Sequence, residues 1–221
     1  MMKILKKILI SFLAGAAIAG GGLVFLLIKS LSTSVVVSTI ASYSFSIGLI
    51  IVLIFGLWLF TGKIGYVFDK KFSALDFILM FFGNLVGATI VGYIAYFLLK
   101  NTELYTINYS TTMTKLSSFD FWDLMLSGIL CGMFVYAAVE AFKIKKLHIS
   151  IRILLVIVFI GTFVVLKLNH CIANMFYISF SNTWSLGTVV FILVNTLGNS
   201  IGAIILNHLN KLTLEMLKKE E

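Results

Sequence analysis

The chain has 221 residues, 60% of them hydrophobic and only 12% charged, and its mean hydropathy is +1.08. About a quarter of the residues of a soluble domain are charged, so this composition argues against a water-soluble fold. The formal net charge of +8 does not indicate nucleic acid as a partner, because the basic residues form short clusters between apolar runs, as in membrane proteins.

Apolar runs occur six times along the chain, and each is long enough for a transmembrane helix, which needs about 20 residues. Six crossings with short loops leave no room for a soluble domain. We therefore expect residues 1–221 to form one all-α, multi-pass domain in the cell membrane, with both termini on the same side. The runs cover residues 8–28, 35–60, 75–99, 121–142, 151–180 and 184–206.

The first run allows a second interpretation. Lys3, Lys6 and Lys7 precede an apolar stretch with small residues at positions 14–22, a pattern that also fits a secretory signal peptide. The internal repeat described below requires this run as a packed helix and therefore favours a membrane span.

The distribution of Lys and Arg predicts the orientation, because basic residues concentrate on the cytoplasmic side of a membrane protein. Three basic residues, Lys29, Lys100 and Lys115, lie at the run ends on one side, against thirteen on the other, and Lys167 lies inside the fifth run. We therefore expect both termini in the cytoplasm. The thirteen are Lys3, Lys6, Lys7, Lys63, Lys70, Lys71, Lys143, Lys145, Lys146, Arg152, Lys211, Lys218 and Lys219.

Two parts of the sequence repeat each other. The pattern G-N-x-x-G-A occurs at 83–88 in the third run and again at 198–203 in the sixth. The first and fourth runs each carry two small residues four positions apart, which suits close helix packing. Three runs per half place the halves in opposite orientations, so we expect inverted repeats at approximately 8–99 and 121–206, the common plan of transport proteins.

Asn84 and Asn199, within the repeated pattern, have two possible roles. An amide in hydrocarbon is unfavourable unless it is paired. Each asparagine can therefore tie two helices together or line a pore.

The second and fifth runs are interrupted at corresponding places. Three glycines and Lys63 interrupt the second at 56–65, and a polar island with Lys167, Asn169, His170 and Asn174 interrupts the fifth at 167–174. Paired breaks in inverted halves indicate a transport site, because irregular backbone at membrane depth lines a cavity or is buried in protein. Free backbone N–H groups at the starts of the broken helices would favour an anion.

His170 is the only histidine within a run, and ionisable groups in spans tend to mark pathways, so we favour a pore role over a structural one. Lys167 either lines the pore and attracts anions or extends toward the interface. Cys131 and Cys171 lack metal-ligand spacing and are interpreted as packing residues. No metal or other cofactor is expected.

At these breaks the sequence resembles the formate/nitrite transporter family, whose members are six-span pentameric channels with an aquaporin-like inverted repeat. The resemblance covers most of the chain, with one motif for each of four spans in the expected order. The motifs are L-F-T at 59–61, F-G-N-L-V-G-A at 82–88, H-x-I-A-N-M-F at 170–176 and G-N-x-I-G at 198–202.

The resemblance implies the residues of the pore. In that family a threonine in the second-span loop faces a histidine in the fifth span, and the matching positions here are Thr61 and His170. Apolar constrictions flank this centre, and in register with the motifs they are Phe45, Leu49, Leu59, Phe60, Val135 and Phe163.

The sequence departs from the family pattern at three places. Asn169 stands where an acidic residue often precedes the histidine, and Gly132 stands where the fourth span commonly has an asparagine. The lysine expected near the outer mouth has a near match in Lys115, one position out of register. Substrate choice can differ accordingly.

The expected function is a channel or facilitator for a small monovalent anion, formate or nitrite, with hydrosulfide as the nearest alternative. A bare anion in an apolar constriction is strongly disfavoured, so a proton supplied by His170 would let a weak acid cross in neutral form. An intramembrane enzyme is not expected, because the spans lack paired carboxylates and nucleophile motifs. A structural scaffold would not need a histidine and two matched breaks.

Overall fold

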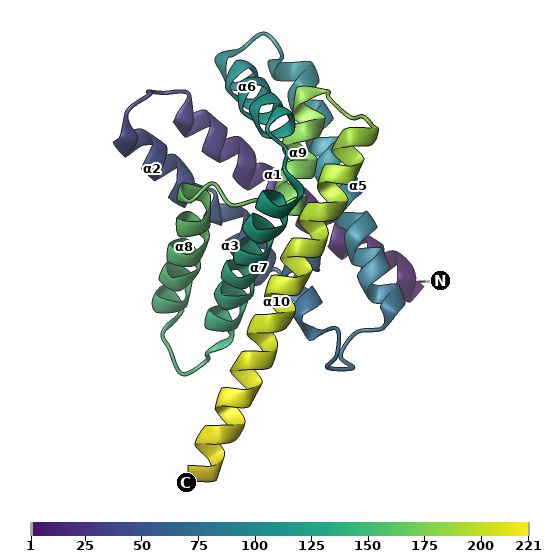
Figure 1. Ribbon diagram of the computed structural model, residues 1–221, viewed down its shortest axis with the longest axis vertical. Helices are drawn as coiled ribbons and strands as arrows, with labels where there is room; N and C mark the ends of the chain where they lie inside the picture. Colours follow the sequence, from purple (N-terminus) through teal and green to yellow (C-terminus); the bar gives the residue numbers. More distant parts are fainter. Residues whose placement is uncertain (1, 221) are drawn as a thin grey trace.

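The computed structural model describes residues 2–220 and the side chains of residues 4–217, and within that range its regular elements are all helices (Figure 1). Polar caps set several starts: the Ser73 hydroxyl accepts from the Asp76 N–H, and the Asp120 carboxylate accepts from the N–H groups of residues 122 and 123. The elements are α1 (Met2–Lys29), α2 (Val35–Ser44), α3 (Ser46–Ile54), α4 (Phe60–Lys63), the 3-10 turn η1 (Ile64–Tyr66), α5 (Ala74–Leu99), α6 (Glu103–Ser117), α7 (Phe121–Lys143), α8 (Ile149–Val165), α9 (Cys171–Ser181) and α10 (Leu186–Glu220).

The predicted spans are present, and the second and fifth are broken where the sequence predicts. The second run stops at Ile54 and resumes as the short helix α4, and the fifth is divided into α8 and α9, two shorter apolar helices. Within the described residues, five helical stretches are long and apolar enough to cross a membrane whole. These are Ile4–Lys29, Val35–Ile54, Ala74–Leu99, Phe121–Lys143 and Leu186–Leu217.

The two halves pack in the same way, as the predicted repeat requires. α1 lies along α5 in the first half, and α7 lies along α10 in the second. A methyl group on Gly15 would overlap the backbone of Asn84, and one on Gly132 would overlap the backbone of Asn199. The glycines thus let the paired helices meet backbone to backbone, at equivalent positions in the two repeats.

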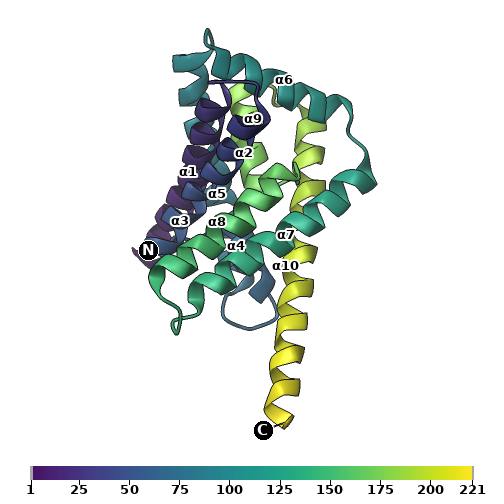
Figure 2. The same ribbon diagram turned by 90° about the vertical axis from the view of Figure 1, so that its left-hand side faces the viewer.

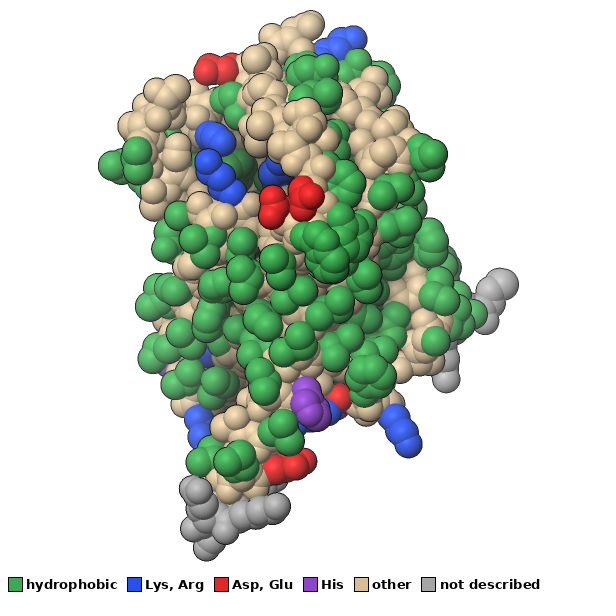
Figure 3. All heavy atoms as spheres, in the orientation of Figure 1, with side chains coloured by type: hydrophobic (Ala, Val, Ile, Leu, Met, Phe, Trp, Pro, Cys, Tyr) green, Lys and Arg blue, Asp and Glu red, His purple; other side chains and the backbone are tan. Residues whose placement is uncertain are grey.

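The outer surface is suited to lipid. Apolar side chains cover the middle of the face in Figure 3, and charged side chains lie above and below this band. Val35, Phe55, Phe97 and Leu186 are each at least 70% exposed. Soluble monomers rarely expose so much contiguous apolar surface, so lipid or neighbouring copies of the chain cover it.

Helix α6 is not among the predicted runs, and it lies across one end of the bundle (Figure 2). Its side chains are largely polar, so no apolar run marks it in the sequence. The Asn108 amide fixes α6 to α9 by donating to the Tyr177 carbonyl at 3.0 Å and to the Ser181 hydroxyl at 2.8 Å. This placement brings the end of α6, with Lys115, beside the break between α8 and α9.

Helix α10 continues beyond the predicted run at 184–206 and fixes the segment that follows α4. The Asn207 amide donates to the Gly65 carbonyl at 2.7 Å and accepts from the Tyr136 hydroxyl at 2.8 Å. Lys211 is paired with Asp69. The side chains of Lys3, Lys218 and Lys219, used to predict orientation, lie outside the described residues.

Candidate functional site

The break in the second run begins with a left-handed residue. α3 ends at Ile54, and Gly56 has φ of +63°, a conformation that glycine adopts without steric penalty. The Leu57 N–H then bonds to the Val52 carbonyl at 2.9 Å, which closes the helix end. The chain runs extended to Leu59 and turns into α4.

The break in the fifth run has the same geometry. α8 ends at Val165, Lys167 has φ of +56°, and the Leu168 N–H bonds to the Phe163 carbonyl at 3.0 Å. Extended backbone at His170 then leads into α9. His170 and Leu59 therefore occupy the same position of the two repeats, directly before the second half of a broken helix.

Asn84 and Asn199 hold these two breaks in equivalent ways. The Asn84 oxygen accepts from the Phe60 N–H at 2.7 Å, and the Asn199 oxygen accepts from the Cys171 N–H at 2.9 Å. Each amide nitrogen donates to two backbone carbonyls, one in its own break and one on the neighbouring helix. Both side chains are fully buried, so the structure favours the helix-tie interpretation over pore lining.

These contacts narrow one expectation from the sequence. The N–H groups of Phe60, Cys171 and Ala173, at the starts of α4 and α9, each bond to a side chain. These three groups are therefore not open to an anion, and free N–H groups at the two helix starts stay an expectation for the other residues of each first turn.

Thr61 and His170 meet between the two breaks. The Thr61 Oγ1 and His170 Nε2 atoms lie 2.9 Å apart, and both side chains are buried. The His170 Nδ1 atom accepts a hydrogen bond from the Ala173 N–H at 3.2 Å, so the neutral ring carries its proton on Nε2 and donates it to Thr61. The Thr61 hydroxyl hydrogen is then available to another acceptor.

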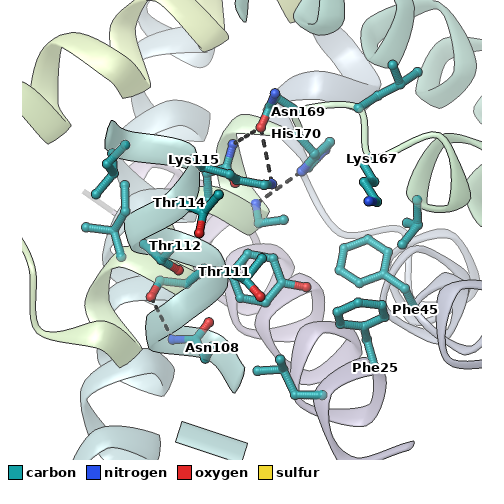
Figure 4. A pocket seen from close by; sticks show the side chains of 18 of the residues that line it. Phe25, Phe45, Asn108, Thr111, Thr112, Thr114, Lys115, Lys167, Asn169 and His170 are labelled. Atoms are coloured by element: carbon teal, nitrogen blue, oxygen red, sulfur yellow. Dashed lines mark hydrogen bonds between the residues drawn. The ribbon is translucent and has the colours of Figure 1, made fainter. Parts of the chain in front are cut away.

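His170 lines a large cavity of about 460 Å³, which we call the lysine vestibule (Figure 4). Figure 4 shows Lys115 entering from α6 and Lys167 from the end of α8, with the rings of Phe25 and Phe45 nearby. The lining contains three lysines and no acidic side chain. Its polar members are Lys29, Asn108, Ser110, Thr111, Thr112, Thr114, Lys115, Lys167, Asn169, His170, Asn174 and Tyr177.

Lys115, which lines the lysine vestibule, is hydrogen-bonded to a series of asparagine side chains. Its amine donates to the Asn169 side-chain oxygen at 3.2 Å and to that of Asn174 at 3.5 Å. Asn174 in turn donates to Asn195 at 2.9 Å. Burial lowers the pKa of Lys115 to about 8. Asn169, which replaces the acidic residue expected from the resemblance, thus accepts from a lysine beside the histidine.

A smaller cavity of about 180 Å³ is lined by Leu49, Leu59, Lys63, Val139 and Lys143, among others. Phe45 and His170 line the lysine vestibule instead. Residues that line the two cavities are therefore close in the sequence. Phe45, in the lysine vestibule, is four residues before Leu49, in the small cavity, and Leu59 is two residues before Thr61.

The predicted constriction residues divide into three groups. Phe45 and Phe163 line the lysine vestibule, with ring centroids 6.0 Å apart, and the Phe163 ring stacks on His170 at 6.1 Å. Leu49 and Leu59 line the small cavity. Val135 and Phe60 line neither cavity: Val135 lies in the main core, and the Phe60 ring packs on Phe81 in a separate cluster.

Sequence reasoning missed two parts of this site. From the sequence, Lys29 serves only to predict the orientation, yet its side chain lines the lysine vestibule. The polar residues of α6 that line the lysine vestibule belong to no sequence motif. The near match of Lys115 to the family pattern is the one sign in the sequence that this segment contributes to the site. Among the described residues, no group of three or more His, Cys, Asp or Glu side chains could hold a metal ion.

Comparison with known proteins gives concordant matches. The family model described as "Formate/nitrite transporter" matches residues 1–212. A "Probable formate transporter" of Methanothermobacter thermautotrophicus is 29% identical over 241 aligned positions, which cover 90% of this chain and 85% of the relative.

Two solved structures share the fold. One, described as "Pentameric formate channel with formate bound", has a TM-score of 0.85 at 21% identity and covers 97% of this chain and 98% of its own. The other, described as "FNT family ion channel", has a TM-score of 0.80 at 22% identity, and the match covers 95% of this chain and 90% of the other.

Proposed function

The chain belongs to the formate/nitrite transporter family, and on that premise we propose that it conducts formate along a path from the lysine vestibule, past Thr61 and His170, to the small cavity. It is a membrane anion channel of that family and not an enzyme. The observation that carries the proposed path is the buried Thr61–His170 pair: His170 lines the lysine vestibule, and Leu59 and Gly62, which flank Thr61 in the sequence, line the small cavity.

Formate is proposed over nitrite and hydrosulfide because the curated relative is a probable formate transporter and one structural relative holds formate. The lining chemistry agrees with a small anion. Three lysines and several hydroxyl and amide groups line the lysine vestibule, so an anion meets positive charge and hydrogen-bond donors there.

The centre can bind a carboxylate through the Thr61 hydroxyl, and also through the His170 Nε2–H where the anion replaces Thr61 as its acceptor. The surrounding Phe45 and Phe163 rings disfavour separated charges, so a neutral acid crosses more readily than a bare anion. If His170 carries a second proton, transfer of its Nε2 proton to formate yields formic acid and a neutral ring. The second proton must sit on Nδ1, where it displaces the Ala173 hydrogen bond, so the charged ring is favoured only beside an anion.

The proposed orientation follows the basic residues. Lys7, Lys143 and Lys211 belong to the predicted cytoplasmic side, and each forms an ion pair there, with Asp76, Glu140 and Asp69 respectively. We place the lysine vestibule on the outer side and both termini in the cytoplasm. The positive-inside distribution supports this assignment.

The proposed assembly is a homopentamer, which the pentameric structural relative and the extensive apolar surface support. In this arrangement each protomer carries its own pore, because Thr61, His170 and both cavities come from one chain. Native mass spectrometry in mild detergent should give the mass of five chains.

The direct test is uptake of labelled formate by liposomes that contain the protein, with nitrite and hydrosulfide measured in parallel and protein-free liposomes as the control. We expect formate uptake well above the control. Uptake of nitrite or hydrosulfide with formate at the protein-free rate would overturn the choice of substrate and leave the family assignment intact.

A further inference from the structure

Lys167 occupies a backbone position that favours glycine. Its φ of +56° is left-handed, and its N–H and that of Leu168 bond back to the Val164 and Phe163 carbonyls at 2.9 and 3.0 Å. Helices often end with such a residue, which is usually glycine because a Cβ crowds the backbone there. A lysine at this position is therefore unfavourable for the fold.

The other half of the chain provides an internal comparison. Gly56, with φ of +63°, lies three residues before Leu59, just as Lys167 lies three residues before His170. The N–H after each residue closes the preceding helix in the same way. The chain thus uses glycine at this position in one repeat and lysine in the other, so the turn itself does not require a lysine.

A lysine near a helix end also interacts favourably with the helix dipole, but this does not explain the position. Val165 and Leu166 precede Lys167 and are 44% and 56% exposed, and Leu166 has right-handed backbone, with φ of −73° and ψ of 0°. A lysine at either position would meet the same helix end without left-handed backbone. Position 167 differs in that its side chain lines the lysine vestibule.

Lys29, at the end of α1, lines the same cavity. Its amine lies over the Phe25 ring, 5.4 Å from the centroid. Neither Lys29 nor Lys167 takes part in the ion pairs found among the described residues, whereas Lys115 is hydrogen-bonded to Asn169 and Asn174. Two ammonium groups thus face the lysine vestibule without a carboxylate.

We propose that Lys29 and Lys167 form an anion-binding subsite of the lysine vestibule, where a small monovalent anion is held before it reaches Thr61 and His170. The subsite deepens the proposed function and rests on it. Each ammonium group offers hydrogen-bond donors, and the apolar walls from Phe25, Phe45 and Phe163 strengthen their attraction for an anion. The subsite raises occupancy at low substrate concentration and leaves the passage at the centre unchanged.

The sharpest test is Lys167→Gly, because it removes the charge and installs the residue that the other repeat uses. Formate uptake by liposomes is measured over a range of formate concentrations at low and high ionic strength. We expect the apparent KM to rise about threefold or more at low ionic strength with unchanged maximal rate. The difference should shrink at high ionic strength, because Lys167 is exposed and salt screens its charge.

Three further variants separate the subsite from other effects. Lys29→Met should raise the apparent KM as Lys167→Gly does, and Lys167→Arg should retain the wild-type value. Lys100→Met is the matched control, because Lys100 ends α5 on the same side without lining the lysine vestibule. Thermal unfolding of Lys167→Gly should occur at or above the wild-type temperature.

An unchanged apparent KM in Lys167→Gly, or an equal rise in Lys100→Met, would overturn the subsite. A lower maximal rate with unchanged KM and less folded protein would also overturn it, in favour of a structural role. Wild-type liposomes that take up no formate would instead contradict the proposed substrate. The same KM comparison with nitrite would then decide the subsite.

Discussion

The Thr61 Oγ1 and His170 Nε2 atoms lie 2.9 Å apart, although 109 positions separate the two residues in the sequence. Each residue comes from a broken helix of its own repeat, and an asparagine of the G-N-x-x-G-A pattern holds each break. The repeat therefore does more than pack helices, because it brings a hydroxyl and an imidazole together at the middle of the bundle.

Removing the Thr61 hydroxyl should impair transport without unfolding the protein. In Thr61→Val the shape is kept, but the His170 Nε2–H loses its acceptor and the anion loses a donor. A hydrogen bond to a charged group contributes about 1.5–3 kcal/mol, so formate flux in liposomes should fall about tenfold or more. The matched control is Thr89→Val, since the Thr89 hydroxyl is buried without a partner among the described residues. Equal flux in both variants would show that the Thr61 hydroxyl has no part in transport.

Phe163 and Phe60 should respond differently to truncation. Phe163→Ala removes a ring that stacks on His170 and lines the lysine vestibule, so larger anions such as acetate should cross faster relative to formate. Phe60→Ala removes a ring that packs on Phe81 away from both cavities, and should mainly lower stability, by about 3–5 kcal/mol. Relative anion fluxes and thermal unfolding measure the two effects. Relaxed selectivity in Phe60→Ala alone would reverse this assignment.

Close contact between the paired helices predicts the effect of a single methyl group. In Gly132→Ala the new methyl would overlap the backbone of Asn199, so the helices must move apart. This should lower the free energy of unfolding by about 1–3 kcal/mol or more. Gly20→Ala is the control, because nothing lies near a methyl group there and alanine favours a helix. Thermal unfolding in detergent should show a lower midpoint only for Gly132→Ala. A similar midpoint for the two variants would refute the contact.

Lys115 predicts a pH dependence above neutrality. Its pKa, lowered to about 8 by burial, means that the charge is present below pH 8 and is lost as the pH rises through it. The neutral fraction of formate also falls with pH, so wild type and variant are compared at each pH. Formate uptake at a fixed low concentration should fall between pH 7 and 9, and Lys115→Met should flatten that part of the profile. A fall of the same size in the variant would assign the titration to another group.

Much of the fold is predictable from the sequence, because the membrane imposes a small number of strict constraints on it. Apolar length predicts the spans, and polar residues inside apolar runs predict the breaks, since such backbone must be buried or line a cavity. The roles of Asn84 and Asn199 are less predictable. Their amides bond to backbone groups that come together only when two helices pack, and no local pattern indicates these partners.

The site itself is predictable only in part. Leu59 and Phe60 are adjacent in the motif, yet Leu59 lines the small cavity and Phe60 packs elsewhere, because successive side chains at the start of a helix point in different directions. Lys29 and Lys115 reach the lysine vestibule through the placement of α1 and α6, which composition does not indicate. Lys167 differs from these two, since the sequence already marks it as a candidate, but its left-handed backbone is not indicated by any sequence pattern.

The central claim is that His170 takes part in passage of the anion, and His170→Asn tests it most directly. The asparagine oxygen can still accept from the Ala173 N–H, so the start of α9 is kept while the imidazole, which can exchange a proton with the substrate, is removed. Flux of labelled formate in liposomes is measured from pH 5 to 8. Because the neutral acid alone crosses faster as pH falls, variant and wild type are compared at each pH.

We expect lower flux in His170→Asn at every pH, together with loss of the pH dependence that this ring contributes; the part assigned to Lys115 remains. A merely structural histidine would reduce the amount of folded protein and leave the profile of each remaining channel unchanged. Equal flux per folded protein across the whole pH range would contradict the account and remove His170 from the mechanism.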